Sequence, residues 1–212
     1  MQVKKNMPAE EEDWRDGRKV HPRYNHPLDN AALAAVNHVC EILRDAFGER
    51  LTPNMITTVG NLLRFTGIWL LYQGRCGWEA GLFTFLGLFL DFVDGHYARK
   101  YGMVTILGDY FDHVSDWIWA ASLGGVLLCR YMIPVPLFCV LALWLPVYVC
   151  HFAAREALRE EVGTSPTVQF TRVAMMGHDP EVVAGKLKFV SSDFGLVVFV
   201  SGLVCWVILK NR

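Results

Sequence analysis

Four aspartates recur at short, regular spacings near the middle of this 212-residue chain. They form two pairs, whose members are three and four residues apart. If both segments are helical, the members of each pair lie on one helix face. Two such faces turned toward each other bring up to four negative charges together, and these repel strongly in a low dielectric. The run reads Asp91-x-x-Asp94-Gly95-x-x-Ala98-Arg99 and then Gly108-x-x-x-Asp112-x-x-x-Asp116.

Divalent cations relieve such repulsion, and a set of ligands made of oxygen alone favours Mg²⁺, Mn²⁺ or Ca²⁺. The segments on both sides of the run are apolar enough to lie in a bilayer. Carboxylates at a membrane are costly and are usually retained for function. The spacing therefore predicts a metal-dependent site built on two helices at a membrane.

The composition supports a membrane setting for these helices. Hydrophobic residues make up 53% of the chain and charged residues 19%, which is too apolar for an ordinary soluble domain of this length. The net charge of -1 gives no basic field for nucleic acid, so we expect no nucleic-acid partner.

The apolar segments predict an all-α, polytopic transmembrane bundle with five spans. The last of them, 189–209, is long enough to cross a hydrocarbon core of about 30 Å. Residues 155–188, by contrast, are polar and interrupted by glycine and proline. The predicted spans are 55–72, 78–93, 110–132, a fourth that ends near 154, and 189–209.

Two segments precede the spans. Residues 1–28 are polar and predict a cytosolic tail, whereas residues 29–51 have apolar positions at three- and four-residue steps. This pattern predicts an amphipathic juxtamembrane helix, with Asp29 or Asn30 as its N-cap, at the membrane surface or under the bundle. Residues 52–212 then form the transmembrane catalytic domain, with the active site at 91–116.

The lysines and arginines predict the orientation of the bundle. If the N-terminus is cytosolic, 15 of the 20 lie in cytosolic segments and 4 on the opposite side, and Arg64 lies within the first span. This satisfies the positive-inside rule and places the aspartates at the cytosolic face. We expect an integral membrane protein whose active site faces the cytosol, in an organelle or plasma membrane that the sequence leaves open.

The aspartate run matches, at every fixed position, the signature of the CDP-alcohol phosphotransferase (CDP-alcohol phosphatidyltransferase) family, which the chain resembles. The stretch Thr52-Pro53-Asn54-Met55-Ile56-Thr57 is also similar to the family's entry into its first span. The resemblance implies transfer of a substituted phosphate from a CDP-linked donor to an alcohol, with release of CMP. One of these two substrates is a lipid, and the reaction belongs to phospholipid synthesis.

The resemblance also implies roles for the signature residues. Two Mg²⁺ or Mn²⁺ ions bind to the four aspartates, and Asp116 in addition removes the proton from the attacking hydroxyl. The nucleotide end of the donor is expected at Gly95, Ala98, Arg99, Thr105 and Gly108. Thr105 is equally consistent with a plain loop residue, and Arg99 alone with a topology anchor.

Acceptor-binding residues are not marked by the signature. His151 and Arg155, at the cytosolic end of the fourth span, are weak candidates, because side chains at a helix end also snorkel to the interface. The acceptor stays open among inositol, serine, glycerol phosphate and diacylglycerol.

The subfamily is unresolved as well. Asp94-Gly95-His96 with a short chain is similar to phosphatidylinositol synthases, in which CDP-diacylglycerol is the donor. Phe111-Asp112-His113 is more similar to choline and ethanolamine phosphotransferases, in which CDP-choline or CDP-ethanolamine is the donor. Members of the family usually have six spans, so a homodimer that completes the bundle is a further expectation. The alternative function is a non-catalytic membrane scaffold subunit of a lipid-synthesis complex, against which the intact set of aspartates argues.

Overall fold

The computed structural model describes residues 16–74, 77–131, 135–158, 175 and 177–211. Every regular element in these ranges is helical, and none is a strand, which confirms the predicted all-α class. The α-helices are α2 (Pro27–Phe47), α3 (Pro53–Gln73), α4 (Gly77–Lys100), α5 (Ile106–Arg130), α6 (Val135–Ala157), α8 (Pro180–Leu187) and α9 (Asp193–Lys210), and the short 3-10 helices are η2 (Pro22–Tyr24) and η3 (Gly48–Arg50).

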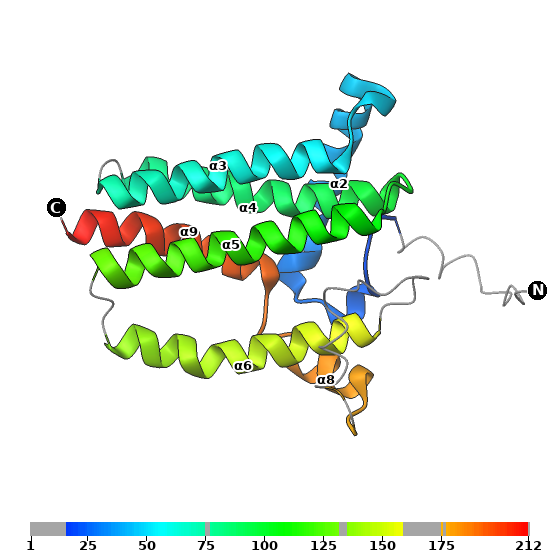
Figure 1. Cartoon of the computed structure of the whole chain (residues 1–212). Helices are drawn as coiled ribbons and strands as arrows, with labels where there is room; N and C mark the ends of the chain where they lie inside the picture. The colour runs from blue at the N-terminus through cyan, green and yellow to red at the C-terminus, as the bar shows by residue number, and fades with distance from the viewer. Residues whose placement is uncertain (1–15, 75–76, 132–134, 159–174, 176, 212) are drawn as a thin grey trace, which may run out of the picture.

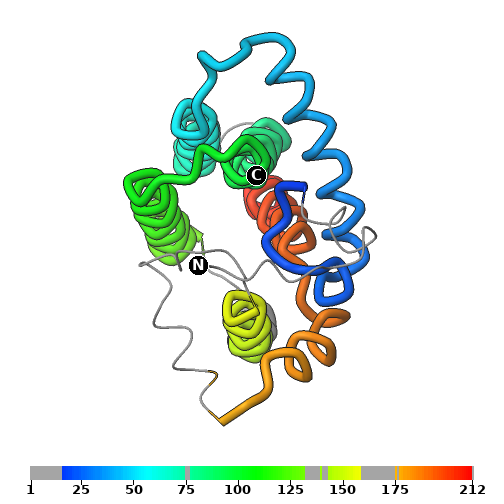
Figure 2. The backbone as a smooth tube through the Cα atoms, turned by 90° about the vertical axis from the view of Figure 1, so that its right-hand side faces the viewer, coloured from blue at the N-terminus to red at the C-terminus, as the bar shows by residue number. Residues whose placement is uncertain are grey.

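Four long helices, α3, α4, α5 and α9, run side by side along one axis (Figure 1), and their apolar faces form the main core. The helix α6 runs along the same axis on the far side of α5 and α9 from α3 and α4 (Figures 1 and 2). The α4 helix packs against both α3 and α9 and is therefore the centre of the bundle. The core residues include Leu71, Ala80, Leu123, Val204 and Ile208.

Three of the long helices begin at a side-chain cap that the local sequence provides. Thr52, Thr105 and Ser192 each accept a hydrogen bond at Oγ from the backbone N–H three residues later, over 3.4, 3.0 and 2.8 Å. Such caps satisfy N–H groups that have no partner within the helix. The first turn of α5 is thereby fixed just before the second aspartate pair.

Glycines allow α3 and α4 to approach closely. A Cβ atom added at Gly87 of α4 would lie 2.6 Å from the carbonyl oxygen of Gly60 and 2.7 Å from the backbone nitrogen of Arg64, both on α3. These atoms belong to a backbone that cannot yield easily, so only glycine fits. The close approach brings α3 against the turn of α4 that precedes Asp91.

The amphipathic segment forms α2, which packs against α4 and α9. Of the two predicted placements, at the membrane surface or under the bundle, this contact agrees with the second. Its buried face includes Val36 and Cys40, whereas Ile42 and Phe47 are exposed. The predicted N-cap is wrong: α2 begins one turn earlier, and His26 caps it by accepting a hydrogen bond from the N–H of Leu28 over 3.0 Å. Proline at the first helical position favours this earlier start.

The part of the predicted tail at residues 1–15 lies outside the described residues. The rest of it, from residue 16, contacts the bundle, and Val20 and Tyr24 are buried there. Within the polar segment 155–188, residues 159–174 and 176 also lie outside the described residues. The proline and glycine residues of this segment leave room for a short helix, and its later part forms the short helix α8.

The helices α3, α4, α5, α6 and α9 correspond to the five predicted spans. Judged by length and composition, one helix of the described residues, α9, is long and apolar enough to cross a membrane. The helices α4 and α5 carry the aspartates, which lower their mean hydropathy. The crossing of the membrane by the other four helices therefore stays a prediction.

The close contact between α3 and α4 predicts how a methyl group added at Gly87 changes the stability of the protein. We expect Gly87→Ala to lower the free energy of unfolding by about 1–3 kcal/mol, because the methyl group overpacks the helix contact. The matched control is Gly124→Ala, since a Cβ atom at Gly124 meets nothing within 4 Å among the described residues. Thermal unfolding in detergent measures both variants, and equal melting temperatures would contradict the packing argument.

Candidate active site

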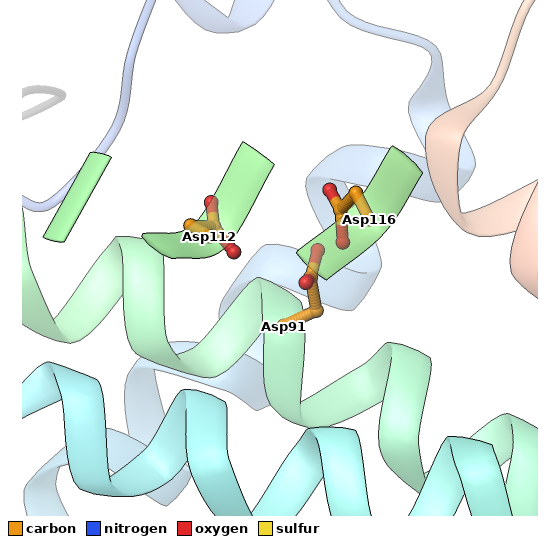
Figure 3. Close-up of side chains that lie close together, drawn as sticks. All are labelled: Asp91, Asp112 and Asp116. Carbon is orange, nitrogen blue, oxygen red and sulfur yellow. The ribbon is translucent and has the colours of Figure 1, made fainter. Parts of the chain in front are cut away.

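The two aspartate pairs come from neighbouring parts of the bundle. Asp91 lies on α4, and Asp112 and Asp116 lie one turn apart on α5. Carboxylate oxygens of these three residues lie within 4.8 Å of one another, and Figure 3 shows the side chains directed toward a common point. The predicted meeting of the two helix faces is therefore present for these three aspartates.

Asp94 lies one turn after Asp91 and is not part of this group of three. It is 3% exposed and lines the same cavity as the other aspartates. The Oδ2 atom of Asp94 and the Oδ1 atom of Asp112 are buried and have no hydrogen-bond partner in the described part of the chain. Buried carboxylate oxygens without a donor fit a cation, so these residues could hold a divalent metal ion.

A buried arginine reaches the aspartates from α3. Arg64 is 1% exposed, and its Nη1 atom lies 2.5 Å from Oδ1 of Asp116 and 3.4 Å from Oδ1 of Asp91. Its Nη2 atom donates a hydrogen bond to Oγ of Ser115 over 3.0 Å. The predicted site does not include this residue. The signal that marks it in the sequence is a single charge within the apolar segment 55–72.

The aspartates line a cavity of about 550 Å³. The five residues that the resemblance assigns to the nucleotide line the same cavity, and so does Arg155 from α6. His151 is not among the lining residues: it is fully buried, and its Nε2 atom lies 3.1 Å from the carbonyl oxygen of Tyr24. The structure thus brings together every predicted site residue except His151. The five nucleotide positions are Gly95, Ala98, Arg99, Thr105 and Gly108.

Two of the predicted nucleotide residues also have a structural contact. The hydroxyl of Thr105 caps α5, and the Nε atom of Arg99 donates a hydrogen bond to the carbonyl oxygen of Gly17 over 2.7 Å. The N-terminal segment therefore lies at the edge of the cavity, which Lys19 and Val20 also line.

His96 follows the first aspartate pair, beyond the predicted end of the second span. Burial, together with the positive charge of Arg99, lowers the pKa of His96 to about 4. The ring is therefore neutral at pH 7, and its Nε2 atom lies 3.2 Å from Oδ1 of Asn37 on α2. This contact joins α2 to α4.

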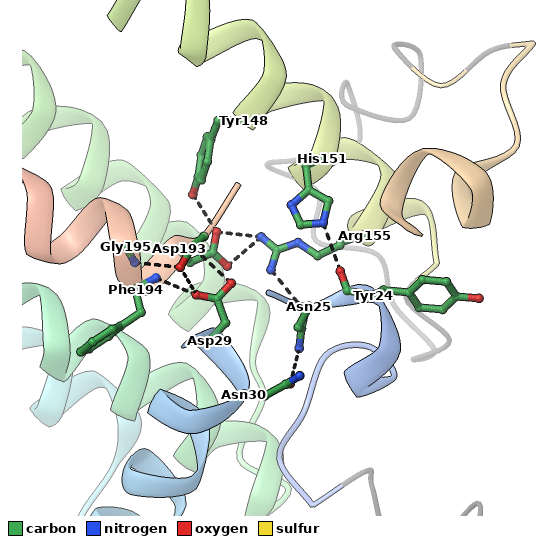
Figure 4. Close-up of polar contacts among 11 residues, drawn as sticks. Tyr24, Asn25, Asp29, Asn30, Tyr148, His151, Arg155, Asp193, Phe194 and Gly195 are labelled. Carbon is green, nitrogen blue, oxygen red and sulfur yellow. Dashed lines mark hydrogen bonds and ion pairs between the residues drawn. The ribbon is translucent and has the colours of Figure 1, made fainter. Parts of the chain in front are cut away.

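A second polar cluster lies at the side of the cavity where α6 meets the start of α9 (Figure 4). Asp193 accepts hydrogen bonds from Nη2 of Arg155 over 2.7 Å and from the hydroxyl of Tyr148 over 3.0 Å. The Nη1 atom of Arg155 lies 3.4 Å from Oδ1 of Asn25. We call these four residues the Arg155 cluster. The sequence marks only Arg155 among them, because its own two partners, Asp193 and Asn25, lie 38 and 130 residues away from it.

Asp29 belongs to α2 but caps α9. Its carboxylate accepts hydrogen bonds from the hydroxyl of Ser192 over 2.6 Å and from the N–H of Phe194 over 2.9 Å. The N–H of Asp193 lies 3.3 Å from its other oxygen. A carboxylate at a helix N-terminus is favoured by the free N–H groups and by the helix dipole.

This cap predicts a loss of stability when Asp29 is truncated. We expect Asp29→Ala to lower the free energy of unfolding by about 1–2 kcal/mol, as the loss of a helix cap usually does. Asp45→Ala is the matched control, because Asp45 is an exposed aspartate on the same helix. Denaturation in detergent compares the two, and an equal loss in both variants would refute the role of Asp29 as a cap.

The family model described as CDP-alcohol phosphatidyltransferase matches residues 50–208, which include α3 to α6, α8 and nearly all of α9. No match is found among the curated proteins.

Proposed function

The chain belongs to the CDP-alcohol phosphatidyltransferase family, and from this premise we propose that it transfers a substituted phosphate group from a CDP-linked donor to an alcohol acceptor and releases CMP. Membership supports a transferase of phospholipid synthesis that is integral to a membrane. The observation that carries the finer proposal is one cavity in which the four aspartates lie beside Arg99, and two of them have a buried oxygen with no donor among the described residues.

Asp116 is the proposed general base. Its side chain is 38% exposed, so an acceptor hydroxyl can approach it from the cavity, while Arg64 orients its carboxylate from the buried side. The acceptor O–H bond breaks as its proton passes to Asp116, and the acceptor oxygen forms a bond to the phosphorus that bears the donor's substituent. The bond from that phosphorus to the bridging oxygen then breaks, and CMP leaves with the oxygen.

The other site residues bind and orient the donor. Arg99 presents N–H groups suited to a pair of phosphate oxygens, and Gly95 leaves space for the nucleotide close to α4. Divalent ions held by Asp91, Asp94, Asp112 and Asp116 would neutralise the pyrophosphate and favour the departure of CMP. The Arg155 cluster faces the same cavity, which supports Arg155 as part of the acceptor site.

The outer surface of the helices supports the proposed membrane setting. Large apolar side chains are exposed along α3, α5, α6 and α9. Soluble proteins rarely expose this many, so the surface suits lipid. We propose five spans with the aspartates at the cytosolic face, and we keep a homodimer as part of the proposal. The exposed apolar side chains on these helices include Leu62, Trp69, Ile118, Leu128, Leu143 and Trp206.

CMP release by the purified protein tests the proposal and resolves the substrate. Two sets of substrates are compared: CDP-diacylglycerol with inositol, serine or glycerol phosphate, and CDP-choline or CDP-ethanolamine with diacylglycerol. We expect CMP release with one set, and a loss of at least about 100-fold in Asp116→Asn, because the general base is removed. Asp45→Asn, on the exposed face of α2, serves as the matched control.

Normal turnover in Asp116→Asn would show that Asp116 is not the general base. No CMP release from either set, together with no binding of a CDP-linked nucleotide, would favour the alternative of a scaffold subunit.

Removal of divalent metal tests the role of the other aspartates. We expect EDTA to stop CMP release, since the aspartates then have no divalent partner to bind the pyrophosphate. Addition of Mn²⁺ or Mg²⁺ in excess of EDTA should restore it. Turnover that continues in EDTA would contradict a metal-dependent reaction.

A further inference from the structure

The aspartates already have a positive partner that belongs to the protein. The guanidinium of Arg64 contacts Asp91 and Asp116, which come from two different helices. Both contacts use the same nitrogen, Nη1, so one N–H-bearing atom lies between the two carboxylates. This is the place that a cation bridging α4 and α5 would take.

Arg64 is also fixed in this place. Its Nε atom donates a hydrogen bond to Oδ1 of Asn61 over 2.8 Å, and its guanidinium lies 5.7 Å from the ring centre of Trp119. The backbone of Arg64 lies against Gly87, at a close contact between the two helices. The residue is 1% exposed and lines the cavity beside the aspartates. The charge therefore stays at the site.

A divalent ion that bridged Asp91 and Asp116 would compete with this charge. Such an ion needs carboxylate oxygens at about 2.0–2.6 Å, and the Oδ1 atoms of both residues already face the guanidinium. The two cations would lie within a few ångströms of each other with little water between them, where like charges repel strongly. This half of the site is unfavourable for a metal ion.

The other half of the site is different. Oδ2 of Asp94 and Oδ1 of Asp112 are the buried aspartate oxygens that lack a donor in the described part of the chain. Both residues line the cavity, as Gly95 and Arg99 do. A metal ion that bound to these two oxygens would displace no contact of Arg64, because Arg64 contacts Oδ1 of Asp91 and Asp116.

We propose that Arg64 takes the place of one of the two divalent ions that the family resemblance implies, so that this chain binds a single divalent ion, on the side of Asp94 and Asp112. The inference rests on the proposed metal-dependent function and makes it more specific. Arg64 acts here as a positioning residue: it supplies a fixed positive charge and holds Asp91 and Asp116 in place on their two helices.

The test counts bound metal directly. Metal-stripped full-length protein in detergent is titrated with Mn²⁺ at pH 7, and free Mn²⁺ is measured by electron paramagnetic resonance. We expect one Mn²⁺ per wild-type chain and two per chain in Arg64→Gln, which frees the oxygens of Asp91 and Asp116. Arg64→Lys keeps the charge and should remain at one.

Arg155→Gln is the matched control, because Arg155 is also a well-covered arginine paired with an aspartate on the cavity wall. We expect one Mn²⁺ per chain in this variant. If Arg64→Gln folds only when Mn²⁺ is present, its melting temperature should rise with Mn²⁺ far more than that of the wild type, which supports the same conclusion.

Two Mn²⁺ ions per wild-type chain, or an unchanged single ion in folded Arg64→Gln, would overturn the inference. CMP release measured on the same preparations keeps it separate from the proposed function. Two bound ions per wild-type chain together with CMP release would contradict the proposed role of Arg64. The proposed transferase reaction would still be supported. One bound ion with no CMP release from any donor would instead count against the proposed reaction.

Discussion

Negative charge that gathers between apolar helices needs a positive partner, and in this protein Arg64 supplies one. An unpaired carboxylate inside a helical bundle is strongly destabilising, and three carboxylates in contact are more so. The guanidinium reaches across from α3 to one aspartate on α4 and one on α5. The three helices that form the site are thus joined at the point where their charges would otherwise separate them.

Close packing of α3 on α4 makes this arrangement possible. Gly60 and Gly87 face each other at a close contact of the two helices, and Arg64 extends from the same contact toward Asp91. A larger residue at either glycine would move the guanidinium away from the carboxylates. Packing and electrostatics therefore depend on one another here, because the glycines set the distance over which the charges interact.

The second polar region connects the ends of the chain. Asp29, near the N-terminal end, caps α9, and Asp193 at the start of α9 pairs with Arg155 of α6. These contacts join α2, α6 and α9 on one side of the cavity that the aspartates line on the other. Residues up to 165 positions apart in the sequence are therefore hydrogen-bonded to each other in this wall of the cavity.

The sequence by itself determined the helices and the spacing of the aspartates along them. Apolar runs and the caps at Thr52 and Thr105 depend on neighbouring residues, and the spacing of Asp112 and Asp116 places them on one helix face whatever surrounds them. Tertiary structure alone decided the partners of Arg64 and the helix that Asp29 caps. Such pairings depend on which helices pack together and how closely, and spacing along the chain carries no information about contacts between distant segments. The same reason explains why Asp29 looked like a cap for its own helix and is instead the cap of another.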